Sequence, residues 1–200
     1  MSDEAEHYRA KMQKRKAMQD RMVAENDREK GLLIVHTGNG KGKSTAAFGM
    51  ALRSAGYGRR VAIIQFIKGA WDTGEQRAFR KFEEQIAFYP MGEGFTWDTQ
   101  DKARDIAACQ RAWKQAQDAM SDPEISLVIL DEINIALRYK YLTCQDVLSG
   151  LAKRPTMQHV VATGRNAPAD LIEAADLVTE MTLVKHPFHA GIKAQEGIEY

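Results

Sequence analysis

The chain has few of the residues that stabilise secreted proteins or cross membranes. Its 200 residues include two cysteines and five prolines. Cys109 and Cys144 lie far apart and form no C-x-x-C pair, which argues against a disulfide framework and favours a reducing compartment. No window approaches the roughly 18 apolar residues of a membrane span, and no apolar stretch of signal-peptide length stands at the N-terminus. We therefore expect a cytoplasmic protein with no membrane partner.

The chain also lacks an excess of charge of either sign. There are 28 lysines and arginines against 27 aspartates and glutamates, for a net charge of +1. Proteins that bind nucleic acid usually carry a basic stripe, and none is visible here, so we expect no nucleic-acid partner. The length suits one α/β domain with a substantial core.

The first 30 residues differ in character from the rest. They contain eight Lys/Arg and seven Asp/Glu, with no glycine or proline. We expect a charged helical segment over residues 1–30 and a single domain over 31–200. The segment is either a solvated helix packed loosely on the domain or a lid over an active site, and helix formation alone does not decide between the two.

A glycine-rich loop is the most informative feature of the chain. It follows an apolar run and leads into a helical pattern that opens at Lys43. Backbone N–H groups converge on phosphate oxygens only where few β-carbons intervene. Lys43 adds a point charge, Ser44 offers a hydroxyl to Mg²⁺, and the helix N-terminus adds partial positive charge. Thr37 stands where the G-x-x-x-x-G-K-[ST] pattern has its first glycine. The predicted nucleotide-binding residues are Gly38, Asn39, Gly40, Lys41, Gly42, Lys43, Ser44 and Thr45.

Apolar runs alternate with helical patterns along the rest of the chain. Strands are expected at 32–36, 61–66, 86–89, 126–130, 159–163 and 177–183, and helices at 43–55, 103–121, 144–152 and 168–175, the last capped by Asn166. The first strand, helix and strand form a βαβ unit, which favours a parallel sheet. The predicted fold is α/β: a P-loop NTPase of RecA-like type, a three-layer sandwich with a mostly parallel central sheet.

A second motif carries acidic residues. Four apolar residues lead directly into Asp131 and Glu132. This resembles Walker B, in which a carboxylate at the end of a strand beside the loop strand holds Mg²⁺, and either acid is a candidate metal partner. Ligands in such sheets lie outside the carboxyl ends of the strands. That edge also receives Lys68 and Arg165, which are placed to face a polyphosphate. Arg165 is the ninth predicted nucleotide-binding residue, because Gly164 lets the backbone turn close to the site.

Two aromatic residues, Phe95 and Trp97, stand in a glycine-bearing loop and not on a periodic face. Core packing is the default explanation for aromatic side chains. Their place at the predicted ligand edge supports the alternative, a flat apolar pocket for a second substrate.

Several segments together resemble the bacterial ATP:corrinoid adenosyltransferase family of the P-loop type, over about residues 31–200. They are the loop 37–45, the segments 65–69, 94–100, 130–132 and 163–165, and the closing stretch 191–200. The F-T-W-D-T-Q tract and the ending are more specific than the loop. Ser44 stands where many relatives have threonine, which retains the hydroxyl.

The resemblance implies transfer of the 5′-deoxyadenosyl group from ATP to a corrinoid reduced to Co(I), with release of triphosphate, in adenosylcobalamin synthesis and corrinoid salvage. It implies that Phe95 and Trp97 press on the lower face of the corrinoid and that the nucleotide lies reversed relative to ordinary P-loop enzymes. Since Co(I) is the nucleophile, no general base is expected, and Lys43 acts by stabilising charge. Mg²⁺ (or Mn²⁺), a flavodoxin-like reductant protein and a homodimer complete the expectation.

Two other classes remain as alternatives, and the first of them shares every element except the aromatic tract. A small-molecule or nucleoside kinase with a P-loop would yield ADP. A RecA-like ATPase would hydrolyse ATP under stimulation by a partner.

Overall fold

The computed structural model describes residues 3–67, 73–92 and 101–199. Lys68, Phe95 and Trp97 lie outside the described residues. The chain divides into two compact units, Met1–Lys30 and Gly31–Tyr200. In the first unit, α1 (Asp3–Ala24) leaves Tyr8 and Met18 exposed. Within the described ranges, no helix combines the length and the apolar character needed to cross a bilayer.

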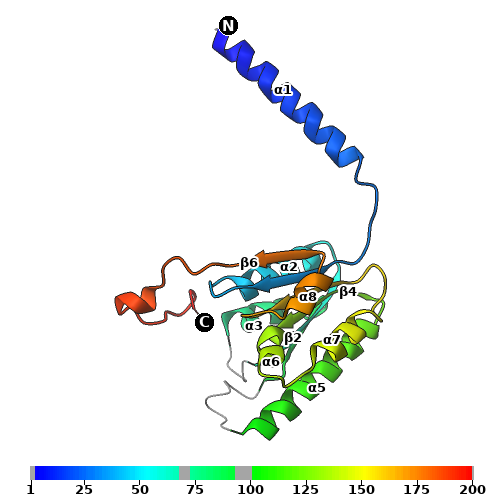
Figure 1. Ribbon diagram of the computed structural model, residues 1–200, viewed down its shortest axis with the longest axis vertical. Helices are drawn as coiled ribbons and strands as arrows, with labels where there is room; N and C mark the ends of the chain where they lie inside the picture. Colours follow the sequence, from blue (N-terminus) through cyan, green and yellow to red (C-terminus); the bar gives the residue numbers. More distant parts are fainter. Residues whose placement is uncertain (1–2, 68–72, 93–100, 200) are drawn as a thin grey trace. The chain divides into compact units, whose positions relative to one another are not determined.

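The second unit is built on a six-stranded sheet in which every neighbouring pair of strands is parallel (Figure 1). The strand order is β3-β2-β4-β5-β1-β6. The strands are β1 (Leu33–Thr37), β2 (Arg60–Gln65), β3 (Ile86–Pro90), β4 (Ile125–Asp131), β5 (His159–Thr163) and β6 (Leu177–Glu180). The predicted parallel sheet is confirmed.

Helices cover both faces of this sheet. The described part contains α2 (Lys43–Gly56), α3 (Gly74–Phe79), α5 (Lys102–Ser121), α6 (Ile133–Arg138), α7 (Cys144–Leu151) and α8 (Ala169–Ala174), with 3₁₀ turns η1 (Arg80–Phe82) and η2 (Pro187–Ala190). Successive residues of a strand face opposite sides. Thus Val128 and Leu130 pack with α5, α6, α7 and α8, whereas Leu127 and Ile129 pack with α2 and α3. These two cores confirm the predicted three-layer sandwich.

The structure differs from the sequence-based expectation in a few local features. Asn166 does not cap α8: its backbone is left-handed, and Pro168 holds the position before the first helical residue. The last strand ends at Glu180, earlier than expected. The short helices α3 and α6 were not predicted, because each has only six residues and is too short to show a periodic pattern.

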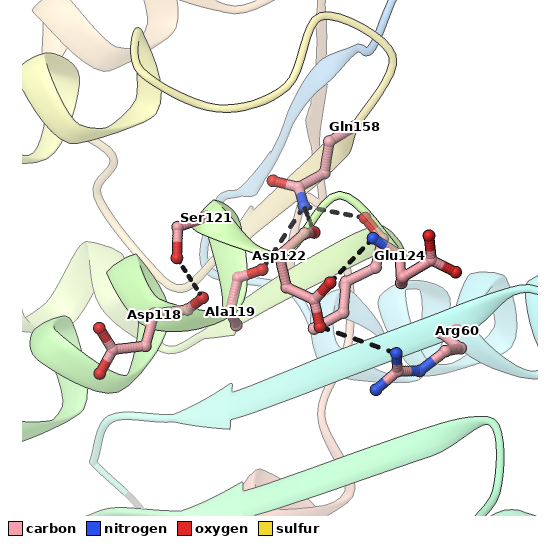
Figure 2. Close-up of polar contacts among 8 residues, drawn as sticks. Arg60, Asp118, Ala119, Ser121, Asp122, Glu124 and Gln158 are labelled. Atoms are coloured by element: carbon pink, nitrogen blue, oxygen red, sulfur yellow. Dashed lines mark hydrogen bonds and ion pairs between the residues drawn. The ribbon is translucent and has the colours of Figure 1, made fainter.

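A buried amide fastens the sheet at the amino ends of its strands. Gln158 precedes β5 and is 2 % exposed. Its side-chain amide donates to the carbonyl oxygens of Asp122 at 3.2 Å and Ile125 at 2.8 Å (Figure 2). Arg60, at the start of β2, forms an ion pair with Asp122 at 3.7 Å. The turn between α5 and β4 is thereby held against β5.

We expect Gln158→Leu to lower the free energy of unfolding by about 1–3 kcal/mol, because the backbone carbonyl groups of Ala119, Asp122 and Ile125 lose a donor that an apolar side chain cannot replace. Urea denaturation measures the change. The control is Arg60→Gln, which removes only a half-exposed ion pair and is expected to cost less than about 1 kcal/mol. Equal stabilities of the two variants would contradict the assigned role of Gln158.

Candidate active site

The phosphate loop occupies residues 38–42, between the end of β1 and the start of α2. Gly38 and Gly42 have φ angles of 92° and 101°, in the left-handed region that favours glycine. Gly42 is also the residue that caps α2. The loop therefore leads directly into the N-terminus of the 14-residue helix α2, whose first N–H groups carry partial positive charge.

Two lysines, one in this loop and one at the start of α2, differ in their surroundings. Lys43 is 7 % exposed, and its ammonium donates a hydrogen bond to the carbonyl oxygen of Gly40. Lys41 is exposed and forms an ion pair with Glu199. Ser44, at the start of α2, is half-buried, and Asn39 and Thr45 are exposed. Eight of the nine predicted nucleotide-binding residues thus lie in the loop and the first turn of α2, and the ninth, Arg165, lies elsewhere in the chain, after β5.

The residue after β6 braces the phosphate loop. Met181 donates its N–H to the carbonyl oxygen of Thr37 at 2.9 Å and accepts from the N–H of Gly40 at 2.6 Å. A Cβ at position 40 would lie 2.6 Å from the Met181 oxygen. Only glycine therefore fits there without a shift of the backbone. No local sequence signal pointed to Met181, since the contact depends on the pairing of β1 with β6.

Asp131 ends β4 and is fully buried. Its two oxygens accept hydrogen bonds from the Gln65 amide at 3.0 Å and the Thr163 hydroxyl at 2.8 Å. Glu132 follows with a left-handed backbone, is half-buried, and donates its N–H to the same hydroxyl at 3.0 Å. The two acids therefore differ in their surroundings: Asp131 is fully buried and hydrogen-bonded through both oxygens, whereas Glu132 is only half-buried.

The expectation that the acidic strand lies beside the loop strand is wrong. β4 pairs with β2 and β5, and β5 separates it from β1. The reason is that β5, later in the chain, is inserted between the two strands, an order that local patterns do not encode. The side chain of Asn134 on α6 links the ends of β1 and β5. Its amide donates hydrogen bonds to the carbonyl oxygens of Gly164 at 2.9 Å and His36 at 3.4 Å. Sequence reasoning missed this residue.

The residues that flank Arg165 contact the end of β1, just before the phosphate loop. The N–H of Gly164 donates to the carbonyl oxygen of His36 at 3.2 Å, and the N–H of Ala167 donates to the Thr37 hydroxyl at 3.0 Å. The segment containing Arg165 therefore runs along the end of β1, and the Arg165 side chain is exposed. A Cβ on Gly164 would approach the Glu132 carboxylate to 3.2 Å. Glycine at this position therefore lets the Glu132 carboxylate lie close to the backbone after β5.

A buried lysine in a glycine-rich loop, at the junction of the loop strand and a helix of a parallel sheet, defines a P-loop nucleotide-binding protein. The sequence matches, over residues 29–200, the family described as ATP:corrinoid adenosyltransferase BtuR/CobO/CobP. Residues 1–23 match a segment described as Cob(I)alamin adenosyltransferase N terminal. The chain belongs to the ATP:corrinoid adenosyltransferase family.

Curated relatives agree with this membership. A corrinoid adenosyltransferase of Pseudomonas aeruginosa is 54 % identical over 195 residues, covering 98 % of this chain and 96 % of the relative. A corrinoid adenosyltransferase of Escherichia coli K12 is 44 % identical over 200 residues, covering both chains completely. The predicted enzyme class is confirmed, with ATP and a corrinoid as its substrates. Nothing in these similarities supports a kinase or a RecA-like ATPase.

Proposed function

We propose that the protein transfers the 5′-deoxyadenosyl group of ATP to Co(I) of a corrinoid, in adenosylcobalamin synthesis and corrinoid salvage. The electron pair of Co(I) forms a bond to the 5′ carbon while the carbon–oxygen bond breaks, and triphosphate leaves with that bonding pair. The observation that carries the proposal is the phosphate loop with Lys43 buried at its end, in a chain of this family.

The protein's part in such a displacement is positioning and charge neutralisation. The loop N–H groups, Lys43 and Arg165 are assigned to the triphosphate. Lys43 stabilises the charge that builds up on the departing oxygens, and no general base is assigned because the nucleophile carries no proton. We also propose that the nucleotide lies reversed relative to ordinary P-loop enzymes, because the reacting atom is the 5′ carbon and not the terminal phosphorus.

Mg²⁺ (or Mn²⁺) fits the oxygen donors at this edge of the sheet. Ser44 and Glu132 are both half-buried residues, whereas Asp131 is fully buried and both its oxygens accept hydrogen bonds. We assign the ion to Ser44 and Glu132, with Asp131 holding the network behind them. When bound, the ion supplies positive charge to the phosphate oxygens.

The corrinoid is assigned to Phe95 and Trp97, which lie outside the described residues. The residues before this tract support the assignment, because Met91 and Gly92 both donate their N–H groups to the carbonyl oxygen of Gln65, at 3.0 and 3.1 Å. Gln65 also contacts Asp131, so Met91 and Gly92 lie at the same edge of the sheet as the acidic motif.

We expect Trp97→Ala to slow adenosylation from Co(II) plus reductant by about 10–100-fold, because apolar rings below the corrinoid exclude an axial ligand and make Co(II) easier to reduce. ATP affinity should stay near the wild-type value. Tyr57→Ala, which removes an aromatic side chain that is 82 % exposed, is the control. Initial rates from Co(II) and from pre-reduced Co(I) are compared, and equal loss in both assays would contradict the role.

Three further assignments complete the proposal: a homodimer, a flavodoxin-like reductant protein and a cytoplasmic location. The family resemblance supports the first two. The cytoplasm is supported by the ATP co-substrate and by Cys109 and Cys144, which are both free thiols.

The test is incubation of the protein with ATP, Mg²⁺ and a chemically reduced corrinoid, followed by identification of the phosphorus-containing product. We expect inorganic triphosphate and a light-sensitive carbon–cobalt bond in equal amounts. Recovery of ADP or orthophosphate alone, with no such bond formed, would overturn the proposal.

A further inference from the structure

The C-terminal segment contacts the phosphate loop at both of its ends. It begins at Met181, which is hydrogen-bonded to Thr37 and Gly40. It then leaves β6, forms η2 and turns back (Figure 1). At its other end the carboxylate of Glu199 forms an ion pair with Lys41. Residues 181–199 are therefore a strap whose two ends lie on the same loop.

In the Lys41–Glu199 ion pair, the carboxylate is more buried than the lysine. The Glu199 side chain is 18 % exposed, against 52 % for Lys41. A turn presents the carboxylate, because the N–H of Glu199 donates to the carbonyl oxygen of Gln195 at 2.9 Å. The hydrogen bond from Lys41 lowers the pKa of the Glu199 carboxyl, and the nearby charge of His186 acts in the same direction. The carboxylate is therefore held in its charged form beside the phosphate loop.

The triphosphate of ATP and the Glu199 carboxylate are both stabilised by the same cation, the Lys41 ammonium. Both are anions, and both gain from a lysine ammonium within hydrogen-bond distance. A partly exposed ion pair contributes little to stability, whereas a polyphosphate brings several negative charges to the loop. These charges attract Lys41 and repel the carboxylate of Glu199.

We propose that Glu199 is a positioning residue that acts through Lys41: its carboxylate competes with the triphosphate tail of ATP for this lysine, and ATP binding releases the C-terminal end of the strap from the phosphate loop. The inference rests on the proposed function, since it requires that the loop bind ATP. It adds a conformational consequence, because occupancy of the loop controls the position of residues 191–199.

The first test is the affinity for ATP of Glu199→Gln. Removal of the competing charge is expected to lower the Kd and the KM for ATP about 2–5-fold, as expected for loss of a partly exposed pair, with kcat unchanged. Glu196→Gln is the matched control, because it removes the same charge three residues away from an exposed side chain. In a Lys41→Met background, Glu199→Gln should have no larger effect than Glu196→Gln.

The second test follows the strap itself by amide hydrogen exchange. ATP should speed exchange over residues 191–199 in the wild-type protein, and Glu199→Gln should already exchange faster without ATP. The inference is overturned if Glu199→Gln matches Glu196→Gln in ATP affinity, or if ATP slows exchange or leaves it unchanged there. A wild-type protein that binds no ATP and transfers no adenosyl group overturns the proposed function as well, so the two failures are distinguishable.

Discussion

Lys43→Ala is expected to reduce adenosyl transfer on the order of 10³-fold, as is typical when one preorganised donor to developing negative charge is removed. The Lys43 side chain is 7 % exposed and its ammonium lies against the Gly40 carbonyl oxygen. In so enclosed a position, water replaces the lost charge poorly. The departing triphosphate would then gain charge without this cation to stabilise it. Initial rates with pre-reduced Co(I) corrinoid measure the loss.

Two further variants separate the lost charge from any lost structure. Lys43→Met keeps the apolar stem and should be as inactive as the alanine variant, because only the ammonium matters for the leaving group. Lys153→Ala removes an exposed lysine and should retain the wild-type rate. Thermal unfolding checks that both Lys43 variants are folded. A folded Lys43→Met enzyme within tenfold of the wild-type rate would contradict the assigned role.

The fold was largely predictable because the sheet is parallel and covered on both sides. Strands buried on two faces appear as nearly continuous apolar runs bounded by polar residues. The seven residues of β4 contain five in succession that are fully or almost fully buried, Leu127 to Asp131. The phosphate loop was predictable for a different reason: its glycines and its lysine are adjacent in the sequence, so the requirement is local.

The contacts that join the strand ends were not predictable in the same way. Asn134 links the ends of β1 and β5, and Met181 braces the phosphate loop. Both contacts depend on which strands are neighbours. A sequence pattern of one strand carries no record of the strand inserted beside it, which is why β5 was not expected between β4 and β1.

This strand order changes the role that the structure favours for Asp131. With β5 in between, the hydroxyl of Thr163 both donates to the Asp131 carboxylate and accepts from the N–H of Glu132. The buried acid therefore orients the turn that carries the half-buried one. The sequence alone did not distinguish Asp131 from Glu132 as the metal partner. Their different roles follow only from burial and hydrogen bonding in the structure.

The phosphate loop also supplies the second large effect, since Gly40→Ala is expected to weaken ATP binding about 10–100-fold. A Cβ at this position would lie 2.6 Å from the oxygen and 2.8 Å from the carbonyl carbon of Met181. The Met181 backbone is held by hydrogen bonds to Thr37 and Gly40 and cannot rotate away like a side chain, so the loop itself must move. Overpacking of this kind costs about 1–3 kcal/mol, and where it is relieved by displacing the loop, the same energy is lost from binding.

The matched control for this variant is Gly49→Ala, on α2, where an added Cβ meets no atom within 4 Å. It introduces the same methyl group inside a helix, so it should leave ATP affinity unchanged and stabilise the protein by about 0.5–1 kcal/mol. Calorimetric titration with ATP compares both variants with the wild type. If Gly40→Ala binds ATP as tightly as Gly49→Ala does, the close contact between Met181 and the loop does not set the shape of the phosphate cradle.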